Sequence, residues 1–294
     1  MANLKDIRRR IVSVKSTRQI TRAMKLVAAA KLRRAQDAIL AARPYAYRIY
    51  SILLSLTEGD AAKHPLLVQR EEKKIKLVVL AGDRGLCGPF NANIFKASEK
   101  FIKAKQASGV EVQVACIGKK AYEYFKDHGE SPVYHTGLLS DPSFSRVAKI
   151  ADELLESFAG EHFDAAYLVY NEFKSAIQQT VVVERLIPIG LELPEGVVGI
   201  RQLSKKDTFI DPIFEPSRQE ILDVLVPRHF KTQLFRSVLE SIASEHGSRM
   251  SAMESATKNA SEMIDKLTLD YNKARQAGIT KELMEIVGGV EAMK

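Results

Sequence analysis

One loop of this sequence combines residue types that bind ligands or act as nucleophiles. The segment Asp83-Arg84-Gly85-Leu86-Cys87-Gly88 follows a short continuous apolar run at residues 76–81 and precedes a predicted helix. Ligands of α/β sheets usually bind at such a turn, between the carboxyl end of a strand and the start of a helix. The loop is nevertheless neither GxGxxG nor GxxxxGK[ST], and it lacks the lysine of a phosphate-binding loop.

Cys87 is the candidate nucleophile of this loop, because a position near a helix start lowers the pKa of a thiol. A phosphatase-type cysteine would need an arginine cradle shortly after it, and Asn93 stands six residues beyond. We therefore predict a strand-to-helix turn in which glycine supplies the tight backbone angles. The redox roles of Cys87 and Cys116 stay open, and the conformation of the 82–89 loop does too.

Histidines do not form a local metal motif in this sequence. None of the six pairs with another at i,i+3 or i,i+4, which is the spacing that places two ligands on one helix face. No Ser/His/Asp order can be chosen from the sequence. We therefore assign no catalytic residue, no metal and no cofactor from these residues.

The middle of the chain alternates strand and helix patterns. Continuous apolar runs are typical of strands buried on both faces, and the segments between them, through about residue 107 and at 119–126 and 142–158, are predicted to be helices. Strands are expected at 76–81, 110–117, 132–135, 163–170 and 178–186, the last two as a possible hairpin. The pattern predicts an α/β domain with a mostly parallel sheet over residues 74–210.

Long helices flank this domain, at residues 1–57 and 217–290. The C-terminal helix repeats apolar and small residues with a 4,3 spacing that is typical of the contact seam of a coiled coil. The seam positions are His246, Met250, Met253, Thr257, Ala260, Ile264, Leu267, Tyr271 and Ala274.

The N-terminal helix carries a matching seam. It begins with Leu4, Ile7, Ile11 and Val14 and resumes from Ala28 to Ala42. In between, the same register would put Arg18 and Lys25 in the seam, while Ile20, Met24 and Val27 lie on a neighbouring stripe. We therefore expect the apolar face to shift around residues 17–27, as a stutter would produce. A kink or break is expected at Pro44, because a proline in a helix interior costs about 3 kcal/mol.

The connectivity predicts an antiparallel pair. One helix enters the central domain and the other leaves it, so two paired helices must run in opposite directions. The C-terminal helix is the longer one, and its end carries Ile279, Leu283, Ile286, Val287 and Val290. This apolar stripe predicts either a tail folded back on the coil or, as we favour, a tip seated in another subunit.

Positive charge is concentrated in the N-terminal helix. Residues 1–48 contain 13 Lys and Arg against two acids, a net charge of +11, so the remainder nets −3 of the total +8. Such a helix predicts an acidic partner: nucleic acid, anionic lipid or an acidic protein surface. The sequence has no apolar run of transmembrane length and no evident signal or transit segment.

Three segments together resemble the gamma subunit of F-type ATP synthases. They are residues 20–32 (ITRAMKLVAAAKL), residues 83–88 (DRGLCG), and residues 272–280 (NKARQAGIT) with 285–289 (EIVGG). The resemblance extends from residue 3 to residue 292. The fold it implies, an antiparallel coiled coil of the two terminal helices plus a Rossmann-like α/β domain, agrees with the pattern described above.

The resemblance implies a non-catalytic central-stalk rotor that couples ion flow through the membrane sector to ATP synthesis at the β subunits. The implied partners are the α and β subunits, the ε subunit and the membrane c-ring. Localisation would be peripheral, at the cytoplasmic face of a bacterial plasma membrane. The driving ion, H⁺ or Na⁺, stays open. The implied partner-interface residues are Met24, Lys25, Arg275, Gln276, Ile279 and Val287.

Two other classes of function remain to be weighed. A basic coiled-coil protein that binds nucleic acid or anionic membrane would explain the +11 segment, although no aromatic residues are interleaved with the basic ones before Pro44. Such binding would weaken steeply with salt. The second class is an α/β enzyme that carries a long helical extension, and it would need a ligand that binds the 82–88 loop.

Overall fold

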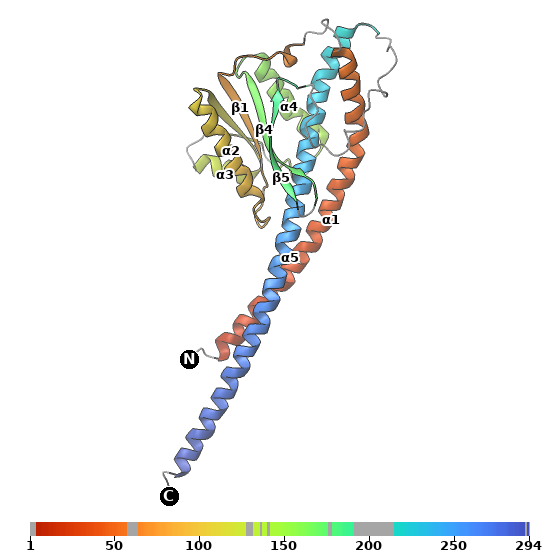
Figure 1. Cartoon of the computed structure of the whole chain (residues 1–294). Helices are drawn as coiled ribbons and strands as arrows, with labels where there is room; N and C mark the ends of the chain where they lie inside the picture. Colours follow the sequence, from red (N-terminus) through yellow and green to blue (C-terminus); the bar gives the residue numbers. More distant parts are fainter. Residues whose placement is uncertain are drawn as a thin grey trace. The chain divides into compact units, whose positions relative to one another are not determined.

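The computed structural model describes residues 4–57, 64–127, 132–135, 137–139, 142–175, 178–190, 215–291 and 293. The chain divides into two compact units, which we describe separately. The first is Met1–Ala29 with Arg249–Lys294, and the second is Ala30–Ser248. The terminal helices, α1 (Leu4–Thr57) and α5 (Arg218–Glu291), each contribute to both units (Figure 1).

A five-stranded sheet forms the centre of the second unit. Its strands lie in the order β3-β2-β1-β4-β5; β1 to β4 are parallel, and β5 is antiparallel to β4. The predicted hairpin is thus confirmed, and so is the mostly parallel sheet. The strands are β1 (Lys74–Leu80), β2 (Glu111–Ile117), β3 (Val133–His135), β4 (Ala165–Phe173) and β5 (Gln179–Ile187).

Helices cover both faces of this sheet (Figure 1). The α2 helix (Phe90–Ala107) and the α3 helix (Lys119–Asp127) bury Ile94 and Phe125 against one face, with strand residues such as Leu77 and Val114. The α4 helix (Phe144–Ala159) lies on the other side, where Lys231 of α5 pairs with Asp152 at 2.6 Å. A 3-10 turn, η1 (Pro65–Leu67), precedes β1. The sheet is therefore enclosed, as its continuous apolar strands require.

Pro44 does not end α1. The helix is continuous from Leu4 to Thr57, so of the predicted kink or break the break is wrong, while the kink stays a prediction. A proline removes only one i→i−4 hydrogen bond, and the turns that follow it bury Ile49, Leu53 and Leu56. Burial of this apolar face offsets the cost of the proline. Pro227 is accommodated inside α5 in the same way.

The first unit is a two-helix coiled coil. Its seam buries Ile7, Ala28, Met253, Ala260 and Ile264, at the spacing that the sequence predicts. Thr21 Oγ1 lies 2.8 Å from Thr257 Oγ1, and Lys25 Nζ lies 2.6 Å from Glu254 Oε1. As the residue number rises on one helix it falls on the other, so the pair is antiparallel, as expected.

The expected stutter at residues 17–27 is wrong. Thr21 is buried and Arg18 and Lys25 are half-buried, so the seam keeps one register through the polar positions. Ile20 and Val27 are instead 57% and 58% exposed. The Thr21–Thr257 hydrogen bond and the Lys25–Glu254 ion pair satisfy the polar groups, so no shift of the apolar face is needed.

Candidate functional site

The 82–89 loop joins the carboxyl end of β1 to the start of α2, as the sequence predicts. Leu86 and Gly88 adopt positive φ angles of 61° and 57°, which gives the chain its tight turn. Cys87 is buried, and Ser248 Oγ donates a 2.6 Å hydrogen bond to the carbonyl oxygen of Cys87. The loop is therefore tied to the α5 residues of its own unit.

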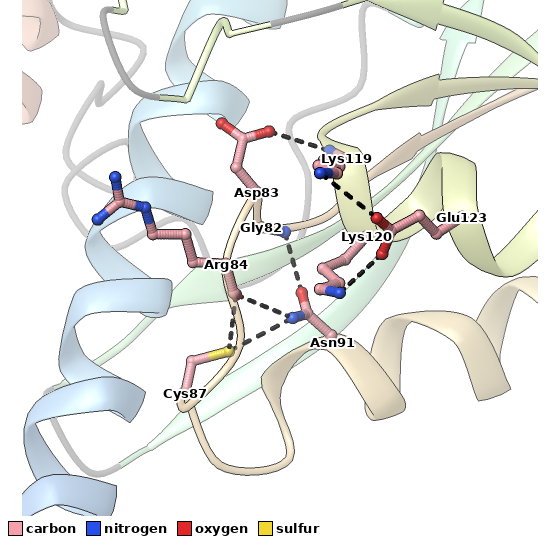
Figure 2. A network of polar contacts seen from close by, with 8 residues as sticks. All are labelled: Gly82, Asp83, Arg84, Cys87, Asn91, Lys119, Lys120 and Glu123. Carbon is pink, nitrogen blue, oxygen red and sulfur yellow. Dashed lines mark hydrogen bonds and ion pairs between the residues drawn. The ribbon is translucent and has the colours of Figure 1, made fainter.

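Asn91, in the first turn of α2, organises the loop (Figure 2). Its Oδ1 accepts a 2.9 Å hydrogen bond from the Gly82 backbone N–H. Its Nδ2 donates to the Arg84 carbonyl oxygen and to Cys87 Sγ, each at 3.4 Å. Sequence reasoning missed Asn91, although an asparagine just after a glycine-rich turn was an available signal for such capping.

A second set of bonds connects the loop to α3. Asp83 Oδ1 accepts from the Lys119 backbone N–H at 2.9 Å, and the Gly82 carbonyl accepts from the Lys120 N–H at 3.1 Å. Lys120 Nζ in turn pairs with Glu123 at 2.7 Å (Figure 2). These contacts engage the polar groups of Gly82 and Asp83 within the protein, which supports a structural turn.

The two cysteines lie in the same apolar core and form no disulfide. Burial raises the pKa of the Cys116 thiol to about 12, so this sulfur stays protonated and unreactive near neutral pH. Within the part of the chain that the structure describes, no three His, Cys, Asp or Glu side chains gather where they could hold a metal ion. Among those same residues, no helix is long and apolar enough to cross a membrane.

We expect replacement of Asn91 by alanine to loosen the loop. The change leaves the N–H of the buried Gly82 without this partner, and an unsatisfied buried group costs about 1–3 kcal/mol. It also removes the hydrogen bond to the exposed Arg84 carbonyl. Thermal unfolding should report this loss, and a maleimide should alkylate Cys87 faster. Asn93→Ala, two residues along the same helix on an exposed position, is the control. Equal alkylation rates in the two variants would contradict the role of Asn91.

The predicted partner-interface residues all lie in the coiled-coil unit. Met24 and Lys25 are half-buried on α1, and Lys25 pairs with Glu254. The other four are exposed on α5, towards its C-terminal end: Arg275, Gln276, Ile279 and Val287. The structure therefore brings Met24 and Lys25 into the seam region and leaves the α5 residues on the surface.

The end of α5 extends past its partner helix. Thr21 faces Thr257, so Leu4, 17 residues earlier, lies level with about Ala274, 17 residues later. The exposed apolar side chains beyond this point include Ile279, Leu283, Met284, Ile286, Val287 and Val290. Within the described residues, α1 provides no helix turn opposite them. This helix face has the composition of a contact surface.

Comparison with known proteins covers the full length of the chain. A protein-family model described as ATP synthase matches residues 3–293. An ATP synthase gamma chain of Geobacter metallireducens is 48% identical over 295 residues, and one of Anaeromyxobacter sp. (strain Fw109-5) is 50% identical over 299 residues. In both comparisons, 100% of each chain is covered.

Solved structures share the fold. A chain in the Euglena gracilis mitochondrial ATP synthase OSCP/F1/c-ring structure aligns with a TM-score of 0.64 and 20% identity, covering 99% of this chain and 94% of that one. A chain in the central stalk/c-ring structure of the Tetrahymena thermophila enzyme aligns with a TM-score of 0.60 and 23% identity, covering 81% and 99%. The predicted fold class is thus confirmed, and the full-length matches give no support to a nucleic-acid-binding coil. With bacterial gamma chains identical at about half of its positions along its entire length, this chain belongs to the ATP synthase gamma family.

Proposed function

We propose that the chain is the central-stalk rotor of an F-type ATP synthase and couples ion flow through the membrane sector to ATP synthesis by rotation. The observation that carries this proposal is full-length identity of 48% to a protein named ATP synthase gamma chain. The functional parts we propose are the helices at 1–57 and 217–290 and the α/β domain at 74–210. A rotor must transmit torque, and two helices that are joined along a seam resist bending better than one.

The coiled-coil unit offers its partners an uneven surface. Ile20, Leu26 and Val27 are exposed apolar residues on the part of α1 that belongs to this unit, and residues 1–29 hold eight Lys and Arg against one Asp, a net charge of +7. Because one face is apolar and its surroundings are basic, neighbouring subunits would meet a different surface at each rotational angle. We propose that this asymmetry biases the catalytic subunits in turn, through differences in contact free energy between their states.

We propose Met24, Lys25, Arg275, Gln276, Ile279 and Val287 as contacts to the catalytic hexamer. The exposure of the four α5 residues supports this assignment, because they are available to a partner. The Lys25–Glu254 ion pair is partly solvated and contributes about 0–1 kcal/mol to the stability of the chain itself. A large functional effect of changing Lys25 would therefore report on a partner.

The remaining partners and the location follow from the same proposal. Besides the α and β subunits, the chain would contact the ε subunit and the membrane c-ring. It would sit peripherally at the cytoplasmic face of a bacterial plasma membrane, held there through the c-ring. We propose that it supplies no catalytic residue; the internal bonding of Gly82, Asp83 and Asn91 in the loop supports a structural role there.

Reconstitution tests this proposal. The full chain is mixed with matching α and β subunits, and assembly and MgATP hydrolysis are compared with α and β alone. We expect a complex with one copy of this chain and hydrolysis that falls several-fold in the double variant Arg275→Ala/Gln276→Ala. Lys100→Ala, an exposed change on α2, should leave assembly and rate unchanged.

The same preparation tests the alternative. Binding to duplex DNA and to anionic liposomes is measured across a range of salt concentrations. If the chain forms no complex with α and β but binds DNA or liposomes with a steep salt dependence, the rotor proposal fails. A complex whose hydrolysis is insensitive to the Arg275/Gln276 change would reject those two residues as contacts while leaving the family assignment intact.

A further inference from the structure

Buried charges accumulate between the sheet and α5 in the Ala30–Ser248 unit. Two strands and the helix contribute them: Glu172 with the phenol of Tyr170 from β4, Glu184 from β5, and Arg236 with Glu240 from α5. The three carboxylates outnumber the single buried guanidinium. We call these five residues the Arg236 cluster.

Arg236 is shared between two carboxylates. Its Nη2 lies 3.5 Å from Glu184 Oε1, and its Nε lies 3.9 Å from Glu240 Oε1. Only 9% of the Glu184 side chain and 12% of the Glu240 side chain are exposed. Within the part of the chain that the structure describes, Glu240 Oε2 is buried without a hydrogen-bond partner. One guanidinium therefore has to compensate two carboxylates that water scarcely reaches.

Among the described residues, the other basic groups near the cluster do not supply the missing positive charge within the core. Arg43 of α1 acts on Glu240, but its side chain is exposed. Lys174 approaches Glu172 only to 3.9 Å. His229 lies near Arg236, and burial followed by the Arg236 charge lowers its pKa to about 4, so the ring is neutral at pH 7. If every carboxyl group were ionised, the cluster would hold an uncompensated anion, which is costly away from water.

Glu240 is the less well-bound of the two carboxylates. Glu184 Oε1 accepts a 2.7 Å hydrogen bond from Gln233 Nε2 in addition to its contact with Arg236. Among the described residues, the ion-pair contact of Glu240 is the long one to Arg236, at a distance beyond hydrogen bonding. A proton on Glu240 would remove one of the two surplus negative charges. Arg236 would then pair with Glu184, and Glu172 would keep its contact with Lys174.

We propose that Glu240 binds a proton in the folded chain below neutral pH and releases it to solvent above, and that this release weakens the attachment of α5 to β4 and β5. The device would make the anchoring of the long helix sensitive to pH in the physiological range. It is independent of the assembly proposed above and can be tested on the full chain alone.

The electrostatic surroundings support this assignment. Burial raises the pKa of Glu240 to about 7 from its usual 4.5; Arg236 and Arg43 oppose the rise, and the charges of Glu172 and Glu184 add to it. Between these two values the folded chain binds more protons than the unfolded chain. The contribution of protonated Glu240 to the free energy of unfolding is therefore fully present below about pH 4.5, and it is lost as the pH rises through 7.

Carbon-13 NMR of the full chain labelled at glutamate Cδ measures the titration directly. The resonance that disappears in Glu240→Gln identifies Glu240, and we expect it to titrate with a midpoint near 7. Glu184→Gln keeps an acceptor for Gln233 but removes the competing charge, so it should lower that midpoint by about one unit or more. A Glu240 midpoint between 4 and 5, or one that Glu184→Gln does not change, would overturn the proposal.

Hydrogen exchange tests the consequence for α5. After correction for intrinsic rates, opening of α5 amides near Arg236 should become about tenfold more frequent between pH 6 and pH 8 in the parent chain. In Glu240→Gln, which cannot ionise, this rise should vanish. Glu262→Gln, an exposed change on the same helix, should retain it. The same pH dependence in all three chains would also overturn the proposal.

Discussion

Replacing Gly118 with alanine is expected to destabilise the Ala30–Ser248 unit by about 4 kcal/mol or more. Gly118 follows β2 with a φ of +102°, a region that residues with a side chain rarely adopt. A Cβ there would lie 1.9 Å from the carbonyl oxygen of Ala81. The oxygen belongs to the backbone, so relief requires movement of the chain at the end of β1. That movement would disturb the bonds that Gly82 and Asp83 make to α3.

The experiment is urea denaturation of the full chain, in which tyrosine fluorescence and near-UV circular dichroism monitor unfolding. The chain has no tryptophan, and eight of its nine tyrosines lie within residues 30–248, so these signals report on this unit. Gly109→Ala is the matched control, because Gly109 has a φ of +78° but no atom lies within 4 Å of the position that a Cβ would take there. The free energy of unfolding of Gly109→Ala should fall only by the cost of the backbone strain, about 1–2 kcal/mol. Equal losses in the two variants would show that the close approach to Ala81 is not decisive.

Removing the Arg236 side chain should have a comparably large effect. Arg236→Met deletes the one guanidinium between Glu184 and Glu240, and breaking a buried ion pair by removing one partner costs about 3–5 kcal/mol. The loss should shrink at lower pH, where Glu240, whose pKa burial raises to about 7, binds a proton. Urea denaturation at pH 6 and pH 8 measures both effects.

Two further chains make this result interpretable. Arg34→Met, an exposed change on α1, should stay within about 0.5 kcal/mol of the parent. The triple change Arg236→Met/Glu184→Gln/Glu240→Gln removes the charges of these three residues and should recover much of the stability, because the remaining carboxylate of the cluster, Glu172, has Lys174 beside it. If Arg236→Met alone is as stable as the parent, the cluster does not hold α5 to the sheet.

Local patterns in the sequence were enough to locate the main elements of this protein. Apolar residues recur with a period of 3.5 to 3.6 in α1 and α5, and they form continuous runs in the strands. Both patterns lie within short windows of sequence, so the sequence alone reveals them. The C-terminal helix was expected at 217–290 and is observed at Arg218–Glu291. The turn after β1 was likewise evident, from its glycines and its place between a strand and a helix.

Which polar residues could be buried depended instead on the packing of distant segments. Thr21 and Lys25 occupy the seam because Thr257 and Glu254 face them, more than 200 residues away in sequence. Arg236 and Glu240 have i,i+4 spacing, which is common on solvated helix faces, and they are buried because β4 and β5 pack there. The free energy of burying a polar side chain depends on its hydrogen-bonding or charged partner. That partner comes from a distant segment, so the tertiary structure decides it and a local pattern does not.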